Sequence, residues 1–496
     1  MSGSTGVGGA GAGRAGAKGG IAREYTAADL QEVDDRCQQI ARELGFDVPP
    51  IVYQLLRSTE IYDIAARGLP GRYSSSRFGA VYREQHEQYR LGRSRIYELI
   101  VNTDPVHAYL LDGNSVVAQT LVIAHCLGHA WFFANNRWFD PTDRAILSRT
   151  RGAAERIDGY MAAYGRDRVE DFIDACGAIA MHQPQAQMVR RADPFEEAPR
   201  TSRYDGLFPQ EVAAARARAA RERDERRRRI PPEPERDLLG FIEKHARGLD
   251  DWQRDVMSIL RNEQAYFLPQ MRTKIANEGL AVLCHQEIVQ RLFLPSDQYW
   301  EYEQLNAAVV QPHPGAVNPY NLGSTILRDI MRIASDPTDE ERERWAWAGK
   351  ADPLEQVRQV CRTHDDEALL REFLSPEVCE RARLYAFEHV QRDPRRIRVT
   401  SREADAIREV LIAQHATLMT PHVEIVDADY AGRGILYLEH RTEREPGLDA
   451  EYARGTLSQI AMLWGRPVIV RTLRDDEPIW FVGHPDGTTE VSTEEP

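Results

Sequence analysis

The chain has 496 residues, of which 42% are hydrophobic and 28% charged, and its formal net charge at pH 7 is −14. This composition is typical of a folded protein with two or three domains, and the acidic balance argues against a general nucleic-acid or membrane-surface binder. The six cysteines show no paired spacing and the N-terminus has no apolar signal-peptide core, so we expect reduced thiols and a cytoplasmic protein.

The first part of the chain predicts a tail followed by helices. Residues 1–22 are dominated by glycine and other small residues, which cannot offset the entropy of ordering the chain, so we expect a disordered tail. Residues 23–190 are expected to form a helical region. Apolar residues recur there at helical spacing, and the predicted helices are 25–44, 51–68, 80–101, 115–134, 142–165 and 166–182.

The helix predicted at 115–134 carries the first chemical signal. It is the most apolar stretch of the chain, yet His125 and His129 interrupt it. Residues four apart share one face of a helix, so both imidazoles are expected to point the same way. The histidines, together with Gln119 and Thr120, leave no uninterrupted run of 18 apolar residues, so we predict no membrane span.

A change of composition marks residues 191–236 as an Arg/Pro-rich linker or insertion. Arginines are concentrated in residues 213–229, and the sequence PPEPE follows. Such a charge block usually forms solvated helix or disorder. Acidic residues interrupt it and no aromatic residues are interleaved for base stacking, so a nucleic-acid role is not expected.

A second helical region is expected at 237–392. Proline residues divide it at the places where helices should begin and end. The predicted helices are 237–247, 251–266, 269–293, 321–334, 354–362, 365–373 and 376–391.

Within this region Glu278 and His285 lie seven residues apart and therefore share a helix face. Together with the two earlier histidines they offer three imidazoles and one carboxylate, a ligand set suited to zinc, iron or manganese. We expect His125, His129 and Glu278 to be ligands. His285 is expected to be a fourth ligand or an outer acid or base. The alternative is a buried hydrogen-bond network without metal.

Two carboxylates are candidate general bases for a metal-bound water. Glu98 lies among apolar residues, and Glu263 lies in the helix before Pro269. Either side chain could accept a proton from water that a divalent cation has acidified. The alternative is that both form ordinary ion pairs with neighbouring arginines.

The sequence Asn318-Pro-Tyr-Asn-Leu-Gly introduces the helix predicted at 321–334. Asn318, Tyr320 and the backbone amides there could bind an anionic or carbonyl group of a substrate. A simple capping turn is the competing interpretation, and it needs no ligand.

The C-terminal part has a mixed texture that predicts a small α+β domain at 393–485, followed by a loose tail at 486–496. The predicted helices are 402–415 and 448–464, and the predicted strands are 423–430, 434–441, 466–473 and 478–483. The expected fold class is therefore mainly α, with a large helical N-terminal and central region and this small C-terminal domain.

Four segments, taken in order, resemble the SpoVR family, named for stage V sporulation protein R. They are HCLGHAWFFANNRWF (125–139), FLPQMRTKIANEGLA (267–281) with His285, VNPYNLGSTILRDI (317–330) and FLSPEVCERARLY (373–385). The likeness extends over about residues 25–485. Leu280 departs from the family's usual tryptophan in NEGWA, and Leu127 from an aromatic residue, but neither is a proposed ligand.

The resemblance implies a link to sporulation, spore cortex formation or a stress response. It also implies an AAA-type serine kinase and a von Willebrand A-like protein as partners. No nucleotide cofactor is indicated. Two functions follow as hypotheses: a metal-dependent enzyme of the hydrolase class, and a non-catalytic regulatory or scaffold protein that works with the kinase.

Overall fold

The computed structural model describes residues 25–91, 95–183, 218, 229–313, 316–390, 393–418, 420–442 and 447–496. The expected tail at 1–22 and nearly all of the arginine-rich stretch 213–229 lie outside these residues. The chain divides into a large unit, Ser2–Gly159 with Tyr266–Leu418, and a small unit, Tyr160–Ala265 with Met419–Pro496. Helices α5 (Ile146–Tyr164) and α9 (Asp251–Arg272) each pass from one unit into the other.

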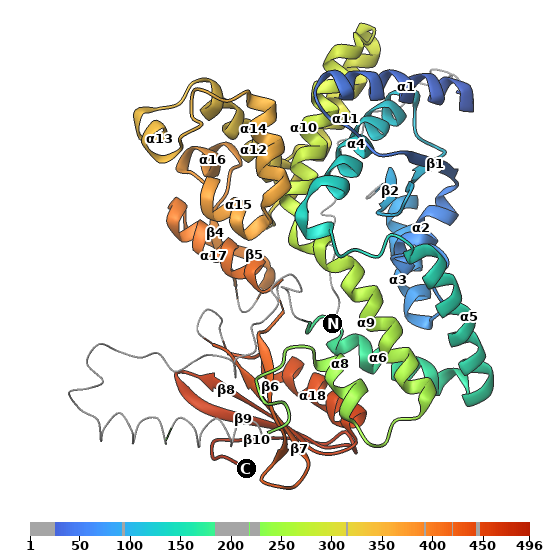
Figure 1. Cartoon of the computed structure of the whole chain (residues 1–496), viewed down its shortest axis with the longest axis vertical. Coiled ribbons are helices and arrows are strands. Elements are labelled where there is room, and N and C mark those ends of the chain that lie inside the picture. Colours follow the sequence, from blue (N-terminus) through green and yellow to red (C-terminus); the bar gives the residue numbers. More distant parts are fainter. Residues whose placement is uncertain are drawn as a thin grey trace. The chain divides into compact units, whose positions relative to one another are not determined.

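The large unit is mainly helical (Figure 1), as the sequence predicts. Its further helices are α1 (Ala27–Glu43), α2 (Ser58–Arg67), α3 (Ser76–Arg90), α4 (Val116–Asn135), the 3-10 helix η1 (Arg137–Phe139), α10 (Lys274–Leu292), α11 (Ser296–Val310), α12 (Pro319–Ser335), α13 (Asp339–Arg344), α14 (Pro353–Thr363), α15 (Asp366–Phe373), α16 (Pro376–Arg381) and α17 (Ala404–Ala416).

Helix α4 is the centre of the large unit's core. The Ser115 side chain caps its first turn by accepting a hydrogen bond from the Ala118 N–H. Every residue from Val117 to Phe133 is buried, so the helix is apolar on all sides and packs against α1, α10 and other neighbours. Among the described residues it is the one helix long and apolar enough to cross a membrane, and 94% of its apolar window is buried inside the protein.

Glycines allow α4, α10 and α12 to approach closely. A Cβ atom on Gly128 of α4 would lie 2.7 Å from the Cα of Ala281 in α10. A Cβ on Gly279 of α10 would lie 2.4 Å from the carbonyl carbon of Gly323 in α12. A larger residue at Gly128, Gly279 or Gly323 would therefore clash with the backbone of the neighbouring helix.

The start of α10 is fixed by a buried aspartate. The Asp366 carboxylate accepts hydrogen bonds from the N–H groups of Ile275 and Ala276, each at 2.9 Å. These are among the N–H groups that lack a partner within the helix, and a carboxylate there is favoured by the helix dipole. Asp366 thereby holds the segment of α10 that carries Glu278.

A small sheet replaces helix in the first part of the large unit, contrary to the sequence prediction. It contains β1 (Ile51–Leu56), β2 (Glu98–Val101) and β3 (Val106–Leu111), in the order β1-β3-β2. The predicted helices 51–68 and 80–101 are therefore wrong over 51–56 and 98–101. Strand β1 pairs in parallel with β3, which joins segments about 50 residues apart, and short apolar runs do not distinguish a buried strand from a helix.

Another sheet replaces the end of a predicted helix. The helix predicted at 376–391 ends with α16 at Arg381, and residues Ala386–Val390 form β4, which pairs antiparallel with β5 (Asp393–Ser401). Both strands and α17 belong to the large unit. The C-terminal segment of the small unit therefore begins at Met419, whereas the boundary predicted from the sequence is residue 393.

The small unit is an α+β structure around a five-stranded sheet. The strand order is β10-β9-β8-β7-β6, and a β7–α18–β8 crossover makes β7 and β8 parallel. Helix α18 packs on β8 and β9 and against α6. Its elements are α6 (Arg166–Ile179), α8 (Leu238–His245), β6 (Val423–Tyr430), β7 (Ile435–His440), α18 (Ala450–Trp464), β8 (Val468–Arg474), β9 (Glu477–Gly483) and β10 (Thr489–Ser492).

Two features of this unit differ from the sequence prediction. Residues 486–496 were expected to be a loose tail, but β10 within them pairs with β9. The unit is also not made of C-terminal residues alone. Glu235 bridges Ile425 of β6, and the rings of Phe241 in α8 and Trp464 in α18 lie 6.2 Å apart.

Candidate metal centre

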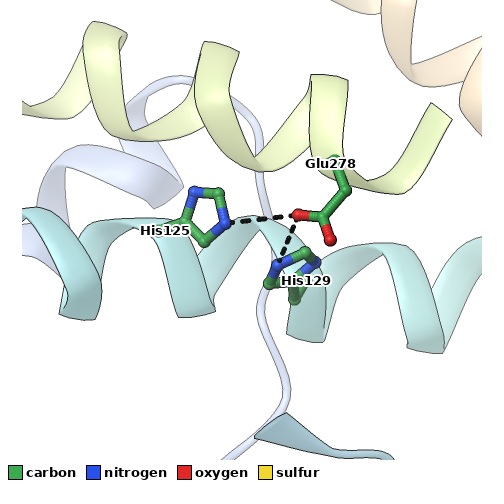
Figure 2. A group of neighbouring side chains, drawn as sticks. All are labelled: His125, His129 and Glu278. Carbon is green, nitrogen blue, oxygen red and sulfur yellow. Dashed lines mark ion pairs between the residues drawn. The ribbon is translucent and has the colours of Figure 1, made fainter. Parts of the chain in front are cut away.

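Two helices bring the predicted ligands His125, His129 and Glu278 together (Figure 2). The histidines lie one turn apart on α4, and Glu278 reaches them from α10. Oε2 of Glu278 lies 3.6 Å from Nε2 of His125 and 3.4 Å from Nε2 of His129. One ligand atom from each residue lies within 4.8 Å of the others, so the three side chains can hold a metal ion.

The opposite ring nitrogens of both histidines are engaged. Nδ1 of His129 lies 2.9 Å from the amide oxygen Oδ1 of Asn277, and Nδ1 of His125 lies 3.1 Å from Nδ1 of His285. An amide oxygen only accepts hydrogen bonds, so His129 donates from Nδ1 and keeps a lone pair on Nε2 when its ring is neutral. Metal-binding histidines are usually held in this way, through the nitrogen that does not bind the metal.

Burial and charge shape this site. The side chains of His125 and His129 are only 3% and 6% exposed, and that of Glu278 is 15% exposed. Burial opposes the charge of Glu278, but the two imidazoles outweigh that effect and hold the pKa of its carboxyl well below its usual range. Burial is the largest single effect on the pKa of His129 and lowers it, but the charge of Glu278 together with hydrogen bonds to Glu278 and Asn277 raises it, so the net shift is upward.

His285 lies behind the ligands rather than among them. Its Nδ1 faces His125, and its Nε2 lies 3.0 Å from Oδ1 of Asn306 in α11. Both ring nitrogens are therefore occupied by protein groups, which favours the outer of the two predicted roles. Burial, followed by the nearby charge of His125, lowers the pKa of His285 to about 3, so its ring is neutral at pH 7.

Comparisons with known proteins identify the family of this chain. The model of the family described as "SpoVR like protein" matches residues 24–420, and that of the "SpoVR-like C-terminal domain" matches residues 421–475. This chain belongs to the SpoVR family. It is 28% identical to "Uncharacterized protein YcgB" of Escherichia coli (strain K12) over 480 residues, which cover 91% of this chain and 92% of that protein. No solved structure matches the chain.

The two predicted general bases of this SpoVR-family chain lie in different units. Glu98 is in β2, in the same unit as the ligands, and burial raises the pKa of its carboxyl. The charges of His125 and His129 reduce that shift and the charge of Glu278 adds to it, so Glu98 lies within electrostatic reach of the cluster. Glu263 is buried in the part of α9 that belongs to the small unit. Its catalytic role stays a prediction with no geometric support.

The two residues predicted to bind substrate have different surroundings. The Tyr320 ring stacks on His125 with centroids 5.9 Å apart, and burial and the charge of Glu278 raise the pKa of its hydroxyl well above the usual value. Asn318 caps α12, accepting from the N–H of Tyr320 and donating to the carbonyls of Val309 and Gln311. Its amide is therefore used by the capping turn, which the sequence offered as the alternative.

Two polar residues that touch the cluster were not predicted from the sequence. Asn277 precedes Glu278 directly, so its position within a buried helix could have indicated it. Asn306 lies on α11, a helix that was not predicted at all, and the sequence carries no sign that it faces His285.

Proposed function

We propose that this SpoVR-family protein binds a divalent transition metal, zinc, iron or manganese, through His125, His129 and Glu278. One observation carries the proposal: Nε2 of His125 and Oε2 of Glu278 are both buried and have no hydrogen-bond partner among the residues that the structure describes. A buried lone pair without a partner is unfavourable by about 1–3 kcal/mol. A cation between these atoms would satisfy both of them and the Nε2 of His129.

The spacing between the carboxylate and each of the two imidazoles supports the same conclusion. A tetrahedral metal with bonds of about 2.1 Å separates its ligand atoms by about 3.4 Å. The distances from Oε2 of Glu278 to the two imidazole nitrogens are 3.4 and 3.6 Å. A direct charge-assisted hydrogen bond would be shorter, about 2.7–2.9 Å.

We further propose that the chemistry is hydrolytic. Two histidines and one carboxylate would supply three protein ligands, the number found in catalytic rather than structural zinc sites. A metal held there would activate a water molecule and polarise a substrate carbonyl or phosphoryl group. Glu98 would accept the proton of that water, because a raised pKa makes its carboxylate a stronger base. Tyr320, held protonated, would donate a hydrogen bond to the substrate.

The direct test is elemental analysis of the full chain purified without chelators, followed by titration of the metal-free protein with zinc, iron(II) and manganese(II). We expect one metal ion per chain. A chain that contains no metal and takes up none in the titration would contradict the proposal.

Glu98→Gln should separate binding from chemistry. The amide keeps the size of the side chain but cannot accept the proton. We expect normal metal content and a fall of about 10²–10⁴-fold in any hydrolytic activity that a substrate screen detects. A matched control is Glu60→Gln, because Glu60 pairs with Arg57 on the surface of α2. Equal activity of both variants would exclude Glu98 as the base.

The alternative proposal is a regulatory or scaffold protein. It is favoured by the raised pKa of His129, because a protonated His129 would pair with Glu278 and have no lone pair left to bind a metal.

In either case the family name supports a link to sporulation, and we propose a cytoplasmic role with the AAA-type serine kinase and the von Willebrand A-like protein as partners. Capture of the kinase by the full-length chain and equally by its His129→Gln variant would favour the scaffold.

A further inference from the structure

The outer side of His125 is connected to the protein surface by consecutive hydrogen bonds. The exposed Arg328 of α12 lies 2.5 Å from Oε1 of Gln286 in α10. Nε2 of Gln286 donates to Oδ1 of Asn306 in α11 at 3.0 Å. The same oxygen lies 3.0 Å from Nε2 of His285, whose Nδ1 is 3.1 Å from Nδ1 of His125.

We propose that this chain of hydrogen bonds fixes the tautomer of His125 that can bind a metal. Its members, from the surface inward, are Arg328, Gln286, Asn306 and His285. The inference rests on the proposed metal site and deepens it, since it assigns positioning roles to residues that do not touch the ion.

The direction of every bond follows from the first one. A guanidinium has only donors, so Gln286 must turn its oxygen toward Arg328 and its NH₂ group toward Asn306. The atom of Asn306 that receives this NH₂ is then its oxygen, which has two lone pairs. The second lone pair accepts from His285, so His285 carries its proton on Nε2.

The tautomer of His285 in turn determines that of His125. A neutral imidazole has one donor and one acceptor nitrogen, so Nδ1 of His285 is an acceptor. His125 must therefore donate from its Nδ1, and the lone pair of its Nε2 points toward Glu278. A nitrogen without a proton cannot donate to Glu278, which fits the finding that the buried Nε2 of His125 has no hydrogen-bond partner in the described part of the chain, and that nitrogen is the one a metal would need.

Two substitutions with the same change of charge should differ in their effect on the tautomer of His125. Asn306→Asp keeps an acceptor for both Gln286 and His285, so the tautomer of His125 is retained. In Gln286→Glu the new carboxylate still accepts a hydrogen bond from Arg328, but it has no N–H to donate to Asn306. The Asn306 amide therefore flips, so that its NH₂ group faces the carboxylate and His285. His285 then accepts at Nε2 and donates from Nδ1, and the proton of His125 moves to Nε2.

The experiment measures zinc affinity by competition with a chromophoric chelator in the parent chain and both variants. We expect Gln286→Glu to bind zinc about 10–100-fold more weakly. Asn306→Asp should bind as tightly as the parent or more tightly. Simple electrostatics predicts that both added negative charges favour the cation, so an equal change in the two variants would overturn the proposal. Thermal melts confirm that each variant is folded.

A second measurement does not depend on metal. Chemical shifts of ¹⁵N-labelled histidine in the metal-free chain, assigned with His125→Gln, report which ring nitrogen is protonated. We expect the proton on Nδ1 of His125 in the parent and in Asn306→Asp, and on Nε2 in Gln286→Glu. An unchanged His125 signal in Gln286→Glu would refute the chain of hydrogen bonds. A parent that binds no zinc would contradict the proposed function instead, and these shifts would still decide whether the chain sets the tautomer.

Discussion

Replacing His129 by glutamine is expected to remove the metal from the purified protein. The substitution deletes one of three ligands that approach each other to within 4.8 Å. Loss of an outer partner of a ligand already weakens metal binding by 10–100-fold, so loss of a ligand should exceed about a hundredfold. The measurement is metal content per chain after chelator-free purification, together with zinc affinity by competition.

A matched control is His440→Gln. His440 is also a buried histidine, but it lies in β7 of the small unit and its Nδ1 contacts Oγ1 of Thr472 at 2.9 Å. We expect this variant to keep the metal content of the parent. If both variants lose metal equally, the loss comes from general destabilisation. If neither loses it, the metal is bound elsewhere.

Metal removal should also lower the melting temperature of the parent. A ligand present at a hundred times its dissociation constant stabilises the folded state by about 2.7 kcal/mol, and a chelator abolishes that contribution. His129→Gln has no such contribution to lose, so its melting temperature should be the same with and without chelator.

Long amphipathic or apolar helices could be predicted from the sequence because their signals are local. The helix predicted at 115–134 is α4, Val116–Asn135, and the strands predicted at 423–430 and 478–483 match β6 and β9 closely. Serine at the start of α4 and glycine after α18 mark helix ends by mechanisms that involve only neighbouring residues.

Strands that depend on distant partners were missed. Residues 51–56 form a strand because β3, about 50 residues later, pairs with them in parallel. Their run of apolar residues fits a helix equally well. The pairing of β10 with β9 likewise turns polar residues near the C-terminus into a strand, since its stability comes from the edge it joins.

The candidate site divides in the same way. Helical spacing places His125 beside His129, and two helices packed together bring in Glu278. Spacing also predicts that His285 shares a face with Glu278, but not which partners its ring nitrogens meet. Asn306 decides that, and its position depends on how α11 packs against α4 and α12.

Replacing Gly323 by alanine should cause the largest loss of stability among single small substitutions in the helices around the site. A Cβ atom there would lie 2.1 Å from the carbonyl oxygen of Ile275 and 2.7 Å from Cα of Gly279. Both neighbours are backbone atoms of α10, so no side chain can rotate away and the two helices must separate. Overpacking typically destabilises by about 1–3 kcal/mol, and a clash with backbone on both sides should lie at the upper end of that range.

Gly79→Ala is the appropriate control for this effect. Gly79 is an exposed residue of α3, and a Cβ atom there meets nothing within 4 Å. Alanine should stabilise that helix by up to about 1 kcal/mol, because it restricts the unfolded chain. Urea unfolding of the full chains, followed by circular dichroism, measures both changes.

Gly323→Ala should also weaken metal binding, because it acts between the helices that carry the site. Glu278 precedes Gly279 on α10, and Tyr320 lies on α12 one turn before Gly323. A shift of α10 away from α12 changes the distance of 3.4 Å between Oε2 of Glu278 and Nε2 of His129. Gly323→Ala with parental stability would show that α12 moves aside without strain, and that the contact between the two glycines does not hold the site together.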